Sequence, residues 1–323
     1  MKRLLLTIGT TGIAMFATQA LAQSTYPTRT VSMVVGFAPG GGTDTVARII
    51  AKDLGSRLGQ QVIVENRDGA GGNIATDLVV KAAPDGHTLL LGNVGSLTVA
   101  PHLLSKLTYK PLQDLAPVTM AVVFPNAIFV PAALPAKNLE EFVKLAKSKP
   151  GAISYGSSGI GGAGHLAGEL FKMQAGVDLL HVPYKGGGPA TVGLLAGEIN
   201  SYFATPVSVR PHVISGKVRV LASTGPERDP LMPEVPTVAE SGYPGYQATN
   251  WYAYVVPAKT PGAIIARLNQ ALNQSLRDPG ILDALKKQGL NASPGTPEQL
   301  RAFMQSEYET WGKVVKQAKM QIE

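Results

Sequence analysis

Residues 30–58 read TVSMVVGFAPGGGTDTVARIIAKDLGSRL, and this stretch decides the fold. Residues 30–37 are mostly apolar and rich in β-branched side chains, which predicts a buried strand. A glycine-rich loop follows from Phe37 to Asp44. From Thr43 to Leu58, apolar residues recur at helical spacing, which predicts a helix with one buried face. Thr43 or Asp44 is the expected N-cap of that helix.

The alternation of strand and helix continues along the whole chain. Strands at residues 61–65 and 88–92 complete a β-α-β-α-β order, which is typical of a parallel sheet covered by helices on both faces. A strand at residues 122–131 is expected to lead into a second half. There, Asn138 is the expected cap of a helix because Glu141 follows three residues later. Later strands are expected at residues 152–155, 179–184, 199–203, 218–222 and 251–256, with an irregular segment at 225–248 and helices from 260 and 296.

Size and composition favour a two-lobed α/β protein and exclude several functional classes. The chain has 323 residues, which is long for one domain. It has no cysteine, which excludes thiol catalysis and zinc sites built from cysteine. Its five histidines are not spaced as metal ligands, so no metal site is predicted. The net charge of +7 comes without a block of Lys and Arg, which argues against nucleic-acid binding.

The first 22 residues have the pattern of a secretory signal. Lys2 and Arg3 precede an apolar stretch, and Ala20-Leu21-Ala22 forms a small-x-small cleavage site. A membrane anchor is the alternative, but the apolar stretch is short and is interrupted by threonines and a glycine. We therefore expect export, cleavage after Ala22 and a chain without a later membrane-spanning segment.

A second glycine-rich loop lies at residues 155–165, again between an expected strand and an expected helix. Such a turn exposes backbone N–H groups at the positive end of the helix dipole, which favours anions. Two loops of this kind, on two α/β units, predict that an anion is held between two lobes.

Other uses of the second loop lack a required partner. Residues 159–164 match G-x-G-x-x-G, but a dinucleotide site also needs an acidic residue after the next strand, which ends in Pro183-Tyr184-Lys185. No cofactor is therefore predicted. Neither loop continues into the Gly-Lys-Ser/Thr of a P-loop. Ile160 also stands where a nucleophile elbow needs glycine. An exported α/β hydrolase that uses Ser157 or Ser158 stays open, because a catalytic triad can be assembled from distant residues.

Five segments, taken in order, resemble those of one known family. They are residues 37–44, the Gly-Ala-Gly-Gly-Asn within 66–73, the Ser157/Ser158 loop ending in Gly164-His165-Leu166, residues 181–186 and residues 235–240. In this order they resemble the Bug family, the TctC-like periplasmic receptors of tripartite tricarboxylate transporters. The resemblance covers essentially the whole chain after the leader.

The resemblance implies a periplasmic Venus flytrap that crosses twice between its lobes, without enzymatic activity. Lobe 1 would comprise residues 23–124 plus 249–323, and lobe 2 residues 125–248. The implied ligand is a small organic carboxylate, a di- or tricarboxylate or an aromatic acid. The implied partners are the membrane permease subunits, and we expect a monomer. A receptor that reports to a signalling partner is an open alternative.

The resemblance also implies which residues meet the ligand. From lobe 1 they are Phe37, Ala38, Gly41, Thr43, Asp44, Asn93 and Ser96. From lobe 2 they are Ser157, Ser158, Gly161, Gly164, His165, Tyr184, Lys185, Gly186 and Thr205. Many relatives carry an acidic residue just after the phenylalanine that matches Phe203, where this chain has Ala204 and Thr205. Loss of that acid removes a partner for an amine and favours a plain carboxylate over an amino acid.

Overall fold

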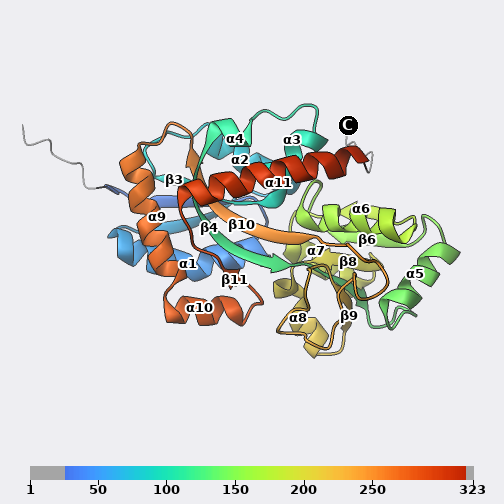
Figure 1. Cartoon of the computed structure of the whole chain (residues 1–323). Coiled ribbons are helices and arrows are strands. Elements are labelled where there is room, and N and C mark those ends of the chain that lie inside the picture. Colours follow the sequence, from blue (N-terminus) through green and yellow to red (C-terminus); the bar gives the residue numbers. More distant parts are fainter. Residues whose placement is uncertain (1–25, 318–323) are drawn as a thin grey trace, which may run out of the picture.

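A computed structural model describes residues 26–317, and the expected signal at residues 1–22 lies outside this range. The chain forms two sheets, each covered by helices on both faces (Figure 1). The first sheet has the order β11-β4-β10-β3-β1-β2 and the second has the order β7-β6-β8-β5-β9. No helix within residues 26–317 is both long enough and apolar enough to cross a membrane.

The first sheet contains the predicted parallel unit. Strand β1 pairs in parallel with β2 on one side and with β3 on the other. Strand β10 pairs antiparallel with both β3 and β4. The strands are β1 (Val31–Val35), β2 (Val62–Asn66), β3 (Thr88–Asn93), β4 (Leu115–Pro125), β10 (Thr249–Pro257) and β11 (Asn291–Ala292).

Alternate side chains of β1 enter two cores, one on each face of the first sheet. Val31, Met33 and Val35 pack with α1, α9 and α10, whereas Val34 packs with α2 and α11. The longer helices here are α1 (Gly42–Leu58), α2 (Asn73–Val80), α9 (Gly262–Leu276), α10 (Pro279–Lys286) and α11 (Pro297–Gln317). Short helical segments are η1 (Ala70–Gly72), η2 (Gly95–Val99), α3 (Ala100–Leu103) and α4 (Pro111–Asp114).

The second sheet is also sandwiched between helices. Helices α5 and α6 cover one face around Phe142 and Phe171, and α7 and α8 cover the other around Leu194 and Val209. Its strands are β5 (Ala127–Pro131), β6 (Ser154–Ser157), β7 (Leu180–Pro183), β8 (Ser201–Ala204) and β9 (Val218–Ser223). Its helices are α5 (Leu139–Ser148), α6 (Ala163–Ala175), α7 (Gly187–Ala196) and α8 (Pro206–Ile214). Asn138 caps α5 as predicted, because its side chain accepts a hydrogen bond from Glu141 N–H at 2.9 Å.

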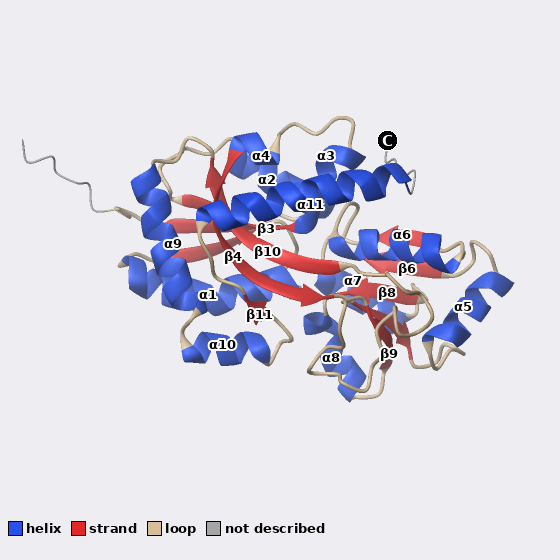
Figure 2. Ribbon diagram, in the orientation of Figure 1, coloured by secondary structure: helices blue, strands red, loops and turns tan. Residues whose placement is uncertain are grey.

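Two long neighbouring strands, β4 and β10, extend from the first sheet toward the second (Figure 2). The expected strand at 122–131 is in fact two strands, because β4 ends at Pro125 and β5 begins at Ala127. Proline has no N–H group to continue a ladder, and the chain passes from one sheet to the other at Asn126. Nearby, β10 begins at Thr249, which pairs with Pro125. The numbered lobe boundaries given above stay a prediction.

Candidate functional site

Four helices begin at one small cavity between the two sheets. They are α1 from the first half and α6, α7 and α8 from the second. The cavity has a volume of about 30 Å³. Its lining residues are Phe37, Gly41, Gly42, Thr43, Asn93, Asn126, Ser158, Ala163, Gly164, Gly187, Tyr202, Phe203, Ala204, Thr205, Ser208, Asn250 and Tyr252.

The helix starts supply backbone donors. The N–H groups of the first turn of an α-helix have no partner within the helix. In α1 the first backbone hydrogen bond within the helix runs from Thr45 N–H to Gly41 O at 3.0 Å. In α6 the corresponding bond runs from Leu166 N–H to Gly162 O at 3.1 Å. Within the described range, no side chain caps the N-terminus of α1, α6, α7 or α8. Helices α2 and α9 also lack a side-chain cap, so the convergence of four helix starts is what distinguishes this cavity.

The cavity lining carries no charged side chain within residues 26–317. Its polar side chains are the hydroxyls of Thr43, Ser158, Tyr202, Thr205, Ser208 and Tyr252 and the amides of Asn93, Asn126 and Asn250. The positive ends of four helix dipoles lie at this uncharged lining, and they favour an anion over a cation.

Asp44 lies beside the cavity but its carboxylate is already engaged. It accepts hydrogen bonds from Gly40 N–H at 3.1 Å, from Arg48 Nε at 3.0 Å and from Asn66 Nδ2 at 3.0 Å. Burial alone would raise the pKa of Asp44, but these hydrogen bonds outweigh burial and hold the pKa below its usual value. The expectation that Thr43 or Asp44 caps α1 is wrong: Gly41 is the N-cap residue, and Asp44 binds back to the loop from the first turn.

The glycine loops are needed because the two halves approach closely. Ala38 N–H donates to Lys185 O at 3.1 Å across the gap between the sheets. A Cβ on Gly41 would lie 3.2 Å from the backbone nitrogen of Gly187, which is tighter than ordinary packing. A side chain at Gly41 would therefore push the first loop away from the start of α7.

The structure brings part of the predicted site together at the cavity. Predicted residues in its lining are Phe37, Gly41, Thr43, Asn93, Ser158, Gly164 and Thr205. Predicted residues outside the lining are Ala38, Asp44, Ser96, Ser157, Gly161, His165, Tyr184, Lys185 and Gly186. Whether any of the sixteen meets a ligand stays a prediction.

Several residues outside the lining have other partners. The Ser96 hydroxyl donates to Asn93 Oδ1 at 3.0 Å, which orients an amide that does line the cavity. Tyr184 donates to Glu198 Oε2 at 3.1 Å, away from the cavity. Lys185 has an exposed side chain and takes part through its backbone oxygen.

Ser157 and His181 form the pair that a hydrolase would need, but their surroundings oppose catalysis. Ser157 Oγ lies 2.7 Å from His181 Nε2, and Ser157 is fully buried in β6. Burial first, and then the neighbouring His165, lower the pKa of His181 to about 3. His181 is stacked between His165 and Tyr155, with ring centroids 4.2 and 4.8 Å away. A base this weak, next to an inaccessible hydroxyl, is unsuited to general-base catalysis near neutral pH.

Sequence reasoning missed the part of the cavity lining that comes from strands and from the crossings between the sheets. This part consists of Asn126, Tyr202, Asn250 and Tyr252, and no local sequence pattern marks them. Ser208 lies in the first turn of α8, a helix that was not predicted. Thr205-Pro206 was the available signal, because proline is favoured at the first position of a helix.

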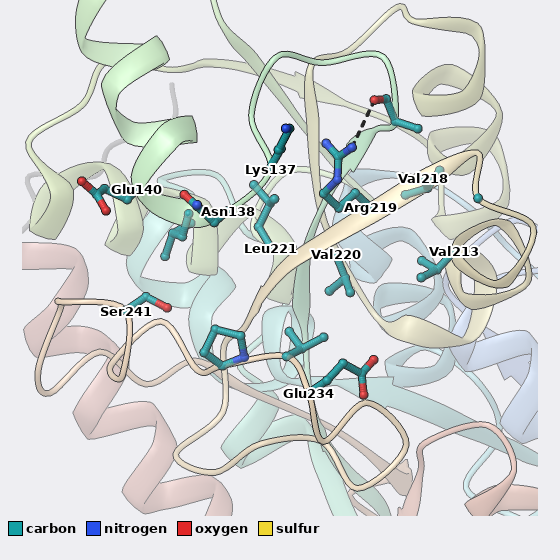
Figure 3. Close-up of a pocket in the computed structure, with 15 residues that line it drawn as sticks. Lys137, Asn138, Glu140, Val213, Val218, Arg219, Val220, Leu221, Glu234 and Ser241 are labelled. Carbon is teal, nitrogen blue, oxygen red and sulfur yellow. Dashed lines mark hydrogen bonds between the residues drawn. The ribbon is translucent and has the colours of Figure 1, made fainter.

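A larger pocket of 680 Å³ lies on the second half, away from this cavity (Figure 3). Lys137, Glu140, Arg219 and Glu234 bring both signs of charge to it. Arg219 Nη1 donates to Ala136 O at 2.7 Å, so its guanidinium already holds the neighbouring turn. No group of His, Asp or Glu within the described range is arranged to hold a metal ion.

Comparison with known proteins gives consistent matches. A family model described as "Tripartite tricarboxylate transporter family receptor" matches residues 46–320. BugT of Bordetella pertussis is 38% identical over 322 residues, which is 98% of each chain. The structure of Rpa4515 of R. palustris with adipate has a TM-score of 0.88 and 34% identity, covering 91% of this chain and 98% of that one. MatC of Rhodopseudomonas palustris with bound malate has a TM-score of 0.86 and 35% identity, covering 90% and 100%. These likenesses confirm the predicted two-lobed α/β fold.

Proposed function

The chain belongs to the receptor family of tripartite tricarboxylate transporters, as its resemblance to Bug and TctC proteins predicted, and we propose that it captures a small organic carboxylate in the periplasm for a membrane permease. The observation that carries this proposal is the convergence of four helix N-termini on one cavity, whose lining has no charged side chain in the described part of the chain. Two structural relatives are described with adipate and with malate, and both of these ligands are carboxylates.

Backbone donors of this kind are sufficient for useful affinity. A hydrogen bond to a charged group contributes about 1.5–3 kcal/mol, and a helix N-terminus adds about 0.3–1 kcal/mol of charge interaction. Micromolar binding corresponds to about 8 kcal/mol. Four to six N–H and O–H contacts therefore reach this range after the cost of ordering the ligand and the lobes.

Ligand access requires the lobes to separate. The cavity of about 30 Å³ is far below the roughly 300–1,000 Å³ of ordinary ligand sites. The two crossings near Asn126 and Thr249 are the natural hinge, because β4 ends and β10 begins there. Binding between the lobes would select a closed shape, which a permease can distinguish from an open one.

The ligand we propose carries carboxylates but no ammonium group. Among residues 26–317 no acidic side chain lines the cavity, and the Asp44 carboxylate is paired with Arg48. Ala204 and Thr205, which follow Phe203 in the lining, carry no acidic group. An amine placed there would be desolvated without a partner, which is unfavourable.

The proposal is tested by thermal shift and calorimetry on the chain from residue 23 onward. The panel contains adipate, malate, citrate and benzoate, with aspartate as the amine-bearing control. We expect at least one acid to raise the melting temperature and aspartate to leave it unchanged. A flat response to all four acids would contradict the proposal. The permease partner is tested separately by co-purification with the cognate membrane subunits.

A further inference from the structure

We propose that Asn126 is a ligand-contact residue, which donates a hydrogen bond from its Nδ2 atom to a carboxylate oxygen of the bound solute. This inference rests on the proposed function and adds a specificity-determining residue to it. Asn126 is 1% exposed and lines the cavity at the crossing between β4 and β5.

The orientation of the Asn126 amide follows from its neighbours. Trp251 N–H donates to Asn250 Oδ1 at 2.8 Å, which fixes the orientation of the Asn250 amide. Asn250 Nδ2 then faces Asn126 Oδ1 at 3.4 Å. The Thr205 hydroxyl approaches the same oxygen at 3.5 Å. The acceptor atom of Asn126 is therefore directed at protein donors, and its donor atom points the other way.

The backbone of Asn126 is held as firmly as its oxygen. Its carbonyl accepts hydrogen bonds from Thr224 N–H at 2.9 Å and from the Thr224 hydroxyl at 3.0 Å. The same hydroxyl, whose one proton is shared between two acceptors, lies 2.7 Å from Ala248 O, and Ala248 N–H donates to Thr224 O at 2.8 Å. Thr224 thereby links Asn126 to the segment just before β10. The Asn126 backbone is thus held at the crossing between β4 and β5.

The Nδ2 atom of Asn126 has no hydrogen-bond partner among residues 26–317. Four other buried side-chain atoms in this range share that property, on His87, Asp229, Tyr254 and Ser275, and none of those residues lines the cavity. Buried donors without partners are rare and costly in native proteins. Asn126 carries such a buried, unpaired donor and lines a cavity large enough for a single polar atom, and this combination is suited to a ligand acceptor.

The position of Asn126 selects the chemistry of the acceptor. Thr205 Oγ1 lies 3.5 Å from both Asn126 Oδ1 and Tyr252 Oη. A Cβ on Gly42, the first residue of α1, would lie 2.9 Å from Tyr252 Oη. Through Thr205 and Tyr252, the Asn126 side chain therefore lies near the start of α1, where the dipole favours negative charge. The amide of Asn126 and the N-terminus of α1 both suit a carboxylate as their ligand.

The test compares calorimetric affinities for the one acid among adipate, malate, citrate and benzoate that binds the wild type most tightly. Asn126→Asp keeps the acceptor for Asn250 and replaces the donor with an oxygen, so we expect its Kd to rise at least about tenfold. Asn126→Ala removes the donor without adding charge, and we expect a rise of about three- to tenfold. If circular dichroism shows that Asn126→Asp does not fold, the affinity of Asn126→Ala decides the test.

Asn200→Asp is the matched control. Asn200 Oδ1 accepts from Ser154 N–H at 2.9 Å, and Asn200 does not line the cavity. Its Kd should stay within about twofold of the wild type. Unchanged affinity in folded Asn126→Asp, or in Asn126→Ala where the first variant does not fold, would overturn the role of Asn126 and leave the receptor function standing. A wild type that binds none of the four acids would overturn both.

Discussion

Closure of the two lobes is most sharply tested by adding one methyl group at Gly95. A Cβ at Gly95 would overlap Gly161 O and lie 3.1 Å from Gly161 C. Gly95 belongs to η2 beside the first sheet, and Gly161 belongs to the loop before α6. Gly95→Ala should therefore act as a wedge between the halves, and its backbone is outside the left-handed region that would strain alanine.

The size of the effect follows from ordinary contact distances. Relieving the overlap needs a separation of about 1 Å, since non-bonded heavy atoms pack about 3.5–4.0 Å apart. A displacement of that size breaks a hydrogen bond between a ligand carboxylate and the start of α6. Loss of one charge-assisted bond of about 1.5–3 kcal/mol predicts a Kd about ten- to a hundredfold higher.

The assay is calorimetry with the best acid of the panel, combined with small-angle X-ray scattering. Ligand should reduce the radius of gyration of the wild type more than that of Gly95→Ala. The melting temperature without ligand should not fall, because alanine is favoured over glycine in helical backbone by about 1 kcal/mol. Gly262→Ala is the control, since nothing lies within 4 Å of a Cβ there. Wild-type affinity in Gly95→Ala would refute closure onto the start of α6.

Three further predictions concern stability. Asn138→Ala removes the cap that accepts from Glu141 N–H at 2.9 Å and should lower the free energy of unfolding by about 1 kcal/mol in urea melts, whereas an unchanged midpoint would contradict the capping role. Asp44→Asn should destabilise the chain by about 1–2 kcal/mol at pH 7. Because folding lowers the pKa of Asp44, the difference from wild type should shrink as the pH falls below about 4, and a constant difference from pH 7 to 3 would count against the Arg48 and Asn66 contacts. Burial lowers the pKa of His165 to about 4 and that of His181 to about 3, so the unfolded chain binds more protons below about pH 6.5 and stability should fall toward pH 4. His181→Phe should make that fall shallower in melts from pH 7 to 4, and an equal slope would show that His181 titrates normally.

Local sequence patterns predicted the parts of the fold that are encoded locally. The strand, loop and helix of residues 30–58 form β1 and α1 because apolar periodicity and glycine punctuation are visible within one segment. Asn138 with Glu141 predicted the start of α5 for the same reason. Helix α8 was missed because Pro211 lies inside it, and proline usually ends a helix.

The lining residues that come from strands and crossings could not be predicted, because strands far apart in the sequence bring them together. Tyr252 reaches the cavity because β10 pairs with β3 and β4, more than 120 residues earlier in the chain. Asn126 lies at the break between β4 and β5, and this break is hidden in the sequence because residues 122–131 read as one apolar segment. Asp44 looked available for a ligand or a cap, and only its pairing with Arg48, Asn66 and Gly40 shows that its carboxylate is occupied.

A crystal structure of the chain with the tightest-binding acid of the panel tests the central claim most directly. We predict that a carboxylate lies between the lobes, with its oxygens within hydrogen-bond distance of first-turn N–H groups of α1 and of at least one helix among α6, α7 and α8. A carboxylate held instead by charged side chains elsewhere, such as those of the pocket around Lys137 and Arg219, would contradict the claim.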